Sequence, residues 1–269
     1  MNKQNGGLRV AALQIHVDAG EPELNFQRVQ SRLQEAASAD IKPDVIILPE
    51  MWNTGYALDR IGELADPEGE RTRTMLAEFS RETGIHAIGG SIAEKKQDKV
   101  FNTMYAFDRE GRLAGEYSKM HLFRLMQEEK HLAAGVQPGL FTLEESQAGM
   151  MICYDIRFPE LARTLALAGA KVLFVPAEWP KPRLHHWRSL LIARAIENQM
   201  YVVACNRTGI SGETEFFGHS MIIDPWGEVL AEGGEEEEIL TVDIDLALVD
   251  EVRGRIPVFE DRRPQLYRL

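Results

Sequence analysis

Cysteine is scarce in this sequence, since only Cys153 and Cys205 occur among its 269 residues. Two cysteines in a chain of this length exclude a disulfide framework. They also make no zinc site unaided, because the chain has no closely spaced set of cysteines and histidines beyond the pair His185-His186. We therefore expect no bound metal.

Long apolar runs are missing as well. No stretch approaches the roughly 18–20 apolar residues that a membrane span needs. The polar segment Met1 to Gly7 lacks the apolar region of a signal peptide. These two absences predict a cytoplasmic protein that is not embedded in a membrane.

Positive charge is in short supply. The chain carries 30 Lys and Arg against 42 Asp and Glu, which gives a formal net charge of −12. This excess of negative charge repels the phosphate backbone of nucleic acids and the surface of anionic membranes. The composition therefore argues against both as partners.

Apolar residues make up 44% of the chain, which is ample for a sizeable core. Short apolar strands are predicted at Val45 to Leu48, Ala87 to Ser91 and Val172 to Val175, and a helix from Arg183 to Asn198. A turn at Asp108 to Arg112 joins two further strands into a hairpin. Because hairpins and α/β alternation occur together, we expect an α/β protein with two packed sheets and helices outside.

The chain is expected to form a single domain over residues 1–269. No internal repeat, low-complexity linker or change of composition divides it. The tail over residues 254–269 carries the apolar side chains Pro257, Val258, Phe259, Leu266 and Tyr267. A tail of this composition is expected to pack on its own domain or on a partner subunit.

Cys153 lies at the junction between a predicted strand and a predicted helix, and it is the most informative residue of the chain. It follows the run of small and apolar residues Ala148 to Ile152, and Pro159 and Glu160 then suit the first turn of a helix. A thiol thus lies where a buried strand ends and a helix soon begins, at the edge where open α/β sheets bind their ligands. A thiolate at this edge can attack a carbonyl or nitrile carbon.

A cysteine nucleophile needs a base that takes its proton and donors that hold the developing oxyanion. Glu50 closes the mostly apolar stretch Asp44 to Pro49, so its carboxylate is expected to emerge at the sheet edge in a setting of low dielectric. Burial of this kind makes a carboxylate a better base near neutral pH. The alternative is a helix cap or a surface carboxylate.

Lys119 offers the cation. It lies just past the predicted strand Leu113 to Tyr117 and next to Met120 and Leu122, so we expect it not to be fully solvated. Near a thiol, the ammonium group would lower the pKa of the cysteine and could hold an oxyanion. The alternative, which local sequence alone favours, is a surface lysine that buries only its stem.

Other residues offer weaker chemistry. Cys205 follows a predicted strand and is interpreted as a buried packing thiol. Four histidines could in principle pair with a nucleophilic cysteine, but their spacing selects none of them: His121, His185, His186 and His219.

The chain resembles the nitrilase superfamily of carbon–nitrogen hydrolases. A glutamate, a lysine and a cysteine occur at the ends of separate strands in the order that the family has. The matching segments cover most of the chain and are Leu48-Pro49-Glu50, Tyr117 to Phe123, Gly149 to Glu160, Arg194 to Gln199 and Gly218 to Ser220. The resemblance implies a four-layer αββα sandwich, usually paired as a homodimer.

Roles for individual residues follow from this resemblance. It implies Glu50 as general base, Cys153 as nucleophile and Lys119 as oxyanion stabiliser. It also implies the backbone N–H of Tyr154 as the second oxyanion donor.

The family places a second glutamate near the site. Glu128 fits the pattern better here, and Glu129 stays open. The resemblance implies no metal and no organic cofactor, with water as the co-substrate.

Within the superfamily, the chain resembles the ω-amidases, which hydrolyse the side-chain amide of 2-oxoglutaramate and 2-oxosuccinamate to a 2-oxo acid and ammonia. The segments that carry this resemblance are Tyr117 to Phe123, Trp226 to Ala231, and Ile256 to Phe259 with Arg263, Leu266 and Tyr267 downstream. The likeness extends to a bacterial group linked to methionine salvage. It implies Tyr56 as a residue that contacts the substrate.

A physical argument stands beside this resemblance. Such a substrate carries a carboxylate at the end far from its amide, so an acidic protein must place a local cation there. The loop Pro176 to Arg183 ends at a predicted helix N-terminus, where anions bind, and an arginine can hold a carboxylate through two hydrogen bonds. We expect Arg183 to bind the substrate carboxylate and Trp179 to wall the pocket. The alternative is a structural loop with a solvated arginine.

Two other functions stay open on the sequence. One is another carbon–nitrogen hydrolase, acting on carbamoyl amines or nitriles. The other is a non-catalytic binding protein on the same fold, against which the set Glu50, Lys119 and Cys153 argues, because a binding protein has no need of all three. The sequence does not rank 2-oxoglutaramate against 2-oxosuccinamate.

Overall fold

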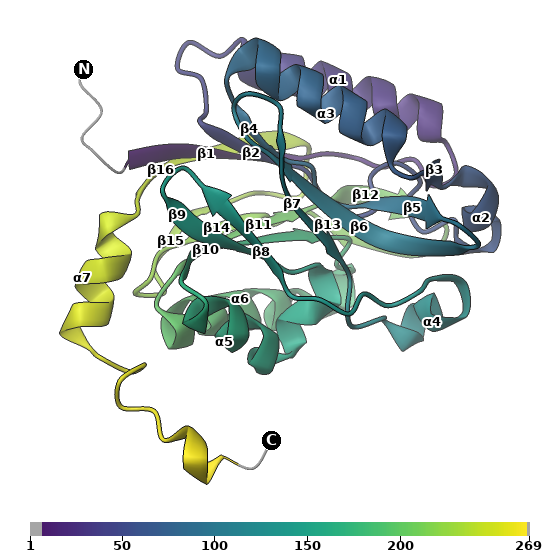
Figure 1. The fold of residues 1–269 in the computed structure, drawn as a ribbon. Coiled ribbons are helices and arrows are strands. Elements are labelled where there is room, and N and C mark those ends of the chain that lie inside the picture. Colours follow the sequence, from purple (N-terminus) through teal and green to yellow (C-terminus); the bar gives the residue numbers. More distant parts are fainter. Residues whose placement is uncertain (1–6, 268–269) are drawn as a thin grey trace.

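Two β-sheets packed face to face form the centre of the protein in the computed structural model, which describes residues 7–267 (Figure 1). Helices cover the outer face of each sheet, so the layers follow one another as α, β, β and α. The predicted αββα sandwich is therefore confirmed. The N-terminal residues 1–6, on which the prediction of no signal peptide depends, lie outside the described residues.

The first sheet has eight strands in the order β16-β1-β2-β4-β6-β5-β3, with β7 paired to β6. Its central strands β1, β2 and β4 run parallel, and β6 and β7 run antiparallel to their neighbours. The strand bounds are β1 Gly7–Gln14, β2 Val45–Ile47, β3 Asp66–Pro67, β4 His86–Ile88, β5 Ile92–Lys96, β6 Lys99–Phe107, β7 Leu113–Ser118 and β16 Glu238–Asp245.

The second sheet has six strands in the order β15-β14-β11-β10-β9-β8. Its strands β9, β10 and β11 are parallel. The strand bounds are β8 Gly139–Leu143, β9 Ser146–Met150, β10 Ala170–Ala177, β11 Tyr201–Asn206, β14 Met221–Ile223 and β15 Val229–Glu232. A separate hairpin joins β12 (Thr208–Ser211) to β13 (Thr214–Phe217).

Four longer helices form the outer layers. Helices α1 (Pro22–Ala37) and α3 (Glu70–Thr83) cover the first sheet, and α5 (Pro159–Leu167) and α6 (Leu184–Asn198) cover the second (Figure 1). The other helices are α2 Ile61–Leu64, α4 Glu128–His131, α7 Ala247–Arg255 and the 3-10 turns Leu58–Arg60, Arg124–Met126, Cys153–Arg157, Lys181–Arg183 and Pro264–Leu266. Within residues 7–267, no helix combines the length and the apolar character that crossing a membrane requires.

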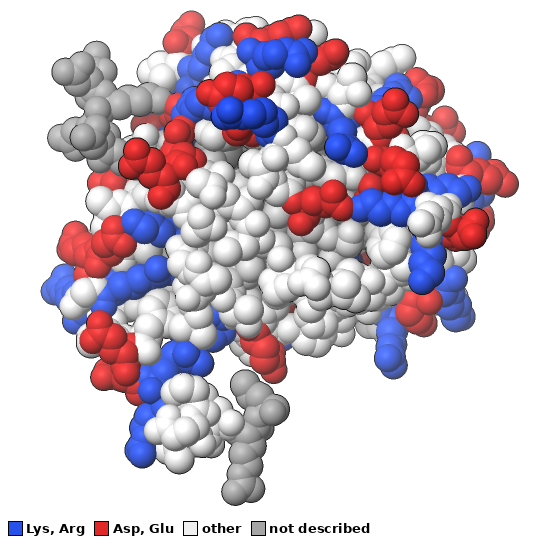
Figure 2. Space-filling model, in the orientation of Figure 1, with Lys and Arg blue, Asp and Glu red and all other residues white. Residues whose placement is uncertain are grey.

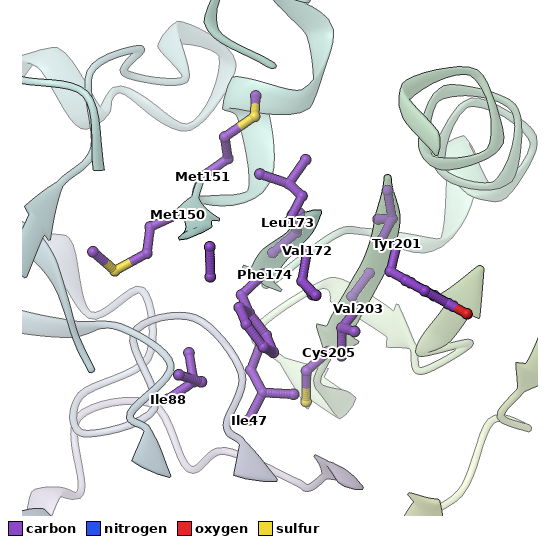
Figure 3. Packing of buried hydrophobic residues seen from close by; sticks show 14 of the residues in the cluster. Ile47, Ile88, Met150, Met151, Val172, Leu173, Phe174, Tyr201, Val203 and Cys205 are labelled. Carbon is purple, nitrogen blue, oxygen red and sulfur yellow. The ribbon is translucent and has the colours of Figure 1, made fainter. Parts of the chain in front are cut away.

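Apolar side chains fill the space between the two sheets. Ile47 and Ile88 of the first sheet face Phe174 and Cys205 of the second, and all four are fully buried (Figure 3). Parallel strands with both faces covered are apolar along their whole length, which explains why short apolar runs predicted them correctly.

The predicted strand Ala87 to Ser91 ends earlier than expected, at Ile88. Gly90 then adopts φ +61°, and a Cβ atom at this position would lie 2.1 Å from the carbonyl oxygen of Pro49. The backbone N–H of Ser91 donates to the same oxygen at 3.0 Å. This close turn, possible only for glycine, holds the segment that leads into Glu50.

The C-terminal tail packs only in part on its own domain. The ring of Phe259 lies between the guanidinium groups of Arg163 and Arg253, at 5.1 and 5.0 Å. Beyond it, Leu266 and Tyr267 are 58% and 50% exposed, and the 3-10 turn Pro264–Leu266 lies apart from the two sheets (Figure 1).

Candidate active site

The ends of strands from both sheets meet at one edge of the sandwich. Glu50 follows β2 and Cys153 follows β9, both of which are parallel central strands of their sheets. Lys119 follows β7, and its backbone N–H continues the ladder by donating to the carbonyl oxygen of Asn102 at 2.9 Å. The topology therefore gathers residues that are far apart in the sequence.

Glu50 is fully buried and is held by four donors. Its Oε1 accepts hydrogen bonds from Lys119 Nζ at 2.8 Å and from Asn102 Nδ2 at 2.8 Å, and lies 2.9 Å from the Tyr56 hydroxyl. Its Oε2 accepts the backbone N–H of Glu178 at 2.7 Å. These contacts fix the carboxylate in one orientation.

Lys119 is also fully buried, so the alternative of a surface lysine is wrong. Its Nζ lies 2.8 Å from a carboxylate oxygen of Glu50 and 2.8 Å from one of Glu128. Burial alone would lower the pKa of the ammonium group, but the two carboxylates outweigh it and hold this pKa well above its usual value. Glu128 is buried and lies 2.6 Å from the Tyr56 hydroxyl, whereas Glu129 is exposed, so Glu128 is the second glutamate of this cluster.

Cys153 begins the 3-10 turn Cys153–Arg157 with φ +46°, a strained conformation for a residue with a side chain. Its side chain is 7% exposed. Burial raises the pKa of the thiol well above its usual range, and the neighbouring Glu50 carboxylate raises it further. Lys119 does lower this pKa, as predicted, but it does not outweigh burial and Glu50, so the expected net lowering is wrong.

Asp155 braces the cysteine turn against the segment that carries the lysine. Its buried carboxylate accepts the Ile152 N–H at 2.9 Å and the Tyr117 hydroxyl at 2.7 Å. The His121 ring lies 2.7 Å from the same carboxylate. His121 is thereby paired with a carboxylate, and His219 likewise lies 2.7 Å from Glu232.

A small pocket lies beside the cysteine. It is lined by Tyr56, Phe123, Met126, Cys153, Tyr154, Arg157, Glu178, Trp179, Pro180 and Arg183. The predicted substrate residues Tyr56, Trp179 and Arg183 therefore share one pocket with the thiol.

Two arginines flank this pocket. Arg183 lies 5.7 Å from the centre of the Phe123 ring, and its carbonyl oxygen accepts the Trp179 indole N–H at 3.0 Å. Arg157 lies 4.7 Å from the centre of the Trp179 ring, and its Nη2 is 3.3 Å from His186. Neither arginine forms an ion pair with a carboxylate of residues 7–267, so both retain charge for a bound anion.

Sequence reasoning missed four residues of this site. Arg157 and Asp155 lie inside the segment that carried the family resemblance, and Glu178 lies inside the Pro-rich loop. Asn102 gave no local signal. Only the register of the predicted hairpin, which pairs Thr103 with Ser118, could have placed it beside the lysine.

The rest of the described molecule offers less chemistry. A larger groove lies between α1 and α3, but it contains none of the three side chains that meet at the sheet edge. Among residues 7–267, no group of three or more His, Cys, Asp or Glu side chains is arranged to hold a metal ion.

Comparison with known proteins agrees with this geometry. The carbon–nitrogen hydrolase family model matches residues 9–254. The chain is 48% identical over 258 residues to 2-oxoglutaramate amidase from Bacillus subtilis, covering 96% of this chain and 98% of that protein. It is 35% identical over 268 residues to human omega-amidase, covering 96% of each chain.

Among solved structures, the fold is similar to that of a carbon–nitrogen hydrolase superfamily protein from Xanthomonas campestris. The TM-score is 0.89 at 29% identity, and the match covers 98% of this chain and 99% of that one. The protein therefore belongs to the carbon–nitrogen hydrolase family, whose members act on carbon–nitrogen bonds other than peptide bonds.

Proposed function

We propose that this protein is an amidohydrolase that cleaves the side-chain amide of 2-oxo dicarboxylic acid monoamides, 2-oxoglutaramate and 2-oxosuccinamate, to a 2-oxo acid and ammonia. The observation that carries the proposal is the convergence of Glu50, Lys119 and Cys153 in one buried cluster beside a pocket. The likeness to amidases of this specificity supports the choice of substrate.

The first step is attack of the Cys153 sulfur on the amide carbon. Because burial and the neighbouring carboxylate raise the pKa of the thiol, the resting cysteine keeps its proton and needs a base. In the proposed mechanism Glu50, whose carboxylate lies close enough to the thiol to raise its pKa, takes this proton as the carbon–sulfur bond forms.

The negative charge that develops on the amide oxygen needs donors. An ammonium group has three N–H bonds, and two of those on Lys119 point to Glu50 and Glu128. The third has only a long contact of 3.4 Å with the Tyr56 hydroxyl, which an oxyanion can replace. The backbone N–H of Tyr154, in the first turn of the 3-10 helix, is proposed as the second donor because such N–H groups have no acceptor within the helix.

The second half of the reaction reverses the proton transfer. Glu50 returns the proton to the nitrogen, the carbon–nitrogen bond breaks, and ammonia leaves a thioester on Cys153. Water, deprotonated by Glu50, then attacks the thioester and releases the acid and the free thiol. Tyr56 is proposed to contact the substrate, and Glu128 is proposed to hold Lys119 in place.

The far end of the substrate is a carboxylate. Arg183 is proposed to bind it, with Trp179 as the wall of the pocket. Arg157 lies against the same indole ring and supplies a second cation. Two arginines without carboxylate partners in a pocket of an acidic protein support a substrate that carries negative charge.

A substrate panel with mass spectrometry tests the proposal. Ammonia release is measured from 2-oxoglutaramate, 2-oxosuccinamate, N-carbamoyl compounds and simple nitriles, and the trapped acyl adduct is mapped to a residue. We expect the two 2-oxo acid amides to be preferred and the adduct to lie on Cys153. Preference for carbamoyl compounds or nitriles would overturn the substrate, and an adduct elsewhere would overturn the nucleophile.

The substitution Arg183→Ala tests how the carboxylate is bound. We expect kcat/KM for 2-oxoglutaramate to fall about 10- to 100-fold, because a hydrogen bond to a charged group contributes about 1.5–3 kcal/mol. The kcat/KM for butyramide, which has no carboxylate, serves as the control and is expected to change less than about threefold. Unchanged kinetics on 2-oxoglutaramate would contradict the role.

We also propose that this single domain forms a homodimer in which the tail contacts the partner subunit. The exposed side chains Leu266 and Tyr267 support a partner for the tail. The face drawn in Figure 2 also has a central area over β7 and β8 largely free of charged side chains, as in the centres of subunit interfaces. Sedimentation of the wild type and of a variant with both tail residues changed to Asp tests this, and a monomeric wild type would contradict it.

The cellular compartment of the enzyme and the source of its substrate are proposed from the family resemblance. The enzyme would act in the cytoplasm, in keeping with two free thiols among the described residues. Its substrate would arise where glutamine donates its amino group to a 2-oxo acid, as in methionine salvage. Accumulation of 2-oxoglutaramate in cells that lack this protein is the expected outcome.

A further inference from the structure

Glu178 is a buried carboxyl group of the pocket that the mechanism above does not use. It follows directly after β10 and is 1% exposed, yet it lines the same pocket as Cys153. Its backbone N–H donates to Glu50 Oε2 at 2.7 Å. The position of this residue relative to the general base is therefore fixed.

The two oxygens of Glu178 differ in their surroundings. Oε2 is 3.4 Å from Nη1 of the buried Arg207, at the long end of hydrogen-bond distance. Oε1 is buried and has no hydrogen-bond partner among residues 7–267. Buried polar atoms are nearly always partnered, so an unpartnered oxygen on a residue that lines the pocket points to a ligand that supplies a donor.

A primary amide brings such donors. Its nitrogen carries two N–H bonds, and leaving either one unpaired in a buried site is unfavourable, because nothing replaces the hydrogen bond that it made to water. Glu50 faces the nitrogen as it delivers the proton to the leaving group, so the remaining N–H needs another acceptor. An ester has no N–H at this position, so it needs no such acceptor.

We propose that Glu178 is a specificity-determining residue that accepts a hydrogen bond from the nitrogen of the reacting amide through Oε1. The inference rests on the proposed cleavage of amides at Cys153, but it does not depend on the 2-oxo acid part of the substrate. It makes the pocket selective for amides over the corresponding esters.

The charge state of Glu178 is compatible with this role. Burial raises its pKa, Arg207 lowers it and Glu50 raises it again, with the result that the pKa is about 8. The groups that face it are Arg207, Glu50, Lys119 and Tyr56. An N–H donor from the substrate favours the ionised form, which is the stronger acceptor.

The test compares an amide with its ester in two variants. Glu178→Met removes the acceptor, and Glu178→Gln presents an NH₂ group to the pocket because Arg207 holds the amide oxygen. In both, we expect kcat/KM for 2-oxoglutaramate to fall at least about tenfold, and kcat/KM for the 5-methyl ester of 2-oxoglutarate to stay within about threefold. The measured quantity is the quotient of kcat/KM for the amide and kcat/KM for the ester.

A control and a second substrate pair keep the outcomes separate. Glu94→Gln changes another buried glutamate, outside this pocket, and is expected to leave the quotient unchanged. An equal fall on amide and ester would mean that Glu178 only supports the fold around Glu50, and no fall on the amide would mean that it does not touch the nitrogen. Either result overturns the proposal. If the wild type cleaves butyramide but not 2-oxoglutaramate, the proposed substrate fails, and the quotient is measured with butyramide and methyl butyrate instead.

Discussion

The two cysteines are both buried, but the residues that surround them differ. Cys205 sits in the regular strand β11 among apolar side chains, and its sulfur donates to the carbonyl oxygen of Leu13 at 3.3 Å (Figure 3). Cys153 sits in a strained turn with Glu50 and Lys119 beside it. Burial raises the pKa of both thiols. Low exposure therefore does not distinguish a reactive cysteine from a packing one.

The difference lies in the neighbours. The Cys205 thiol has no base beside it to take its proton, since its partners within residues 7–267 are the Leu13 carbonyl oxygen and the Ser220 hydroxyl. A proton on Cys153 can pass to the carboxylate of Glu50, and the charge that then forms can be met by Lys119. The comparison indicates that reactivity here comes from a buried base and cation rather than from a lowered thiol pKa.

Exchanging the cysteines for alanine tests this comparison most strongly. We expect Cys153→Ala to lower ammonia release by at least about 10⁴-fold, because the covalent route is lost. Cys205→Ala should retain activity within about threefold and lose about 1 kcal/mol of stability through a small cavity. Retained amidase activity in Cys153→Ala would refute the nucleophile. Strong loss in Cys205→Ala without unfolding would mean that the two regions are coupled.

The substitution Lys119→Ala tests the part of this comparison that concerns the buried ammonium group beside Cys153. We expect kcat to fall about 10²–10³-fold, the usual cost of one oxyanion donor. The free energy of unfolding should also fall by about 3–5 kcal/mol, because Glu50 and Glu128 lose the charge between them. Activity assays and chemical denaturation measure both effects.

Lys171 provides the matched control for this variant. It pairs with Asp250 at 2.6 Å on the surface, so Lys171→Ala should change stability by no more than about 1 kcal/mol. A rate for Lys119→Ala within tenfold of the wild type would contradict the proposed role of its ammonium group.

The apolar region was the easier of the two to predict from the sequence. Runs such as Val45 to Leu48 mark strands buried on both faces, and hydrophobic spacing locates the helices that cover them. The predicted strand Ala87 to Ser91 is too long by three residues at its end, because Gly90 turns the chain toward Pro49. That contact joins distant segments and leaves no periodic signal.

The polar region was predicted only as far as the family resemblance reached. Local sequence favoured a surface position for Lys119, and its burial depends on meeting two distant carboxylates. Glu128 and Glu129 have the same chemistry, and only the direction that α4 presents to the site separates them. Glu178 looked like part of a loop, because nothing local marks a carboxyl group that a distant strand end encloses.

The substitution Glu178→Gln tests whether the polar pocket reduces stability in a way that the apolar region does not. The pKa of this carboxyl group is raised from 4.5 to about 8 in the folded protein. Between about pH 5 and 8 the unfolded chain therefore carries an ionised glutamate while the folded protein keeps the proton, so the wild type loses stability as the pH rises. Glutamine does not titrate, and the stability of the variant relative to the wild type should grow across this window by on the order of 2–4 kcal/mol. Chemical denaturation at several pH values measures this difference.

Cys205→Ala is the control, because the raised pKa of the Cys205 thiol keeps its proton in place throughout the window. The stability difference between this variant and the wild type should therefore stay flat. A flat difference for Glu178→Gln as well would mean that this carboxyl group is already ionised in the folded pocket.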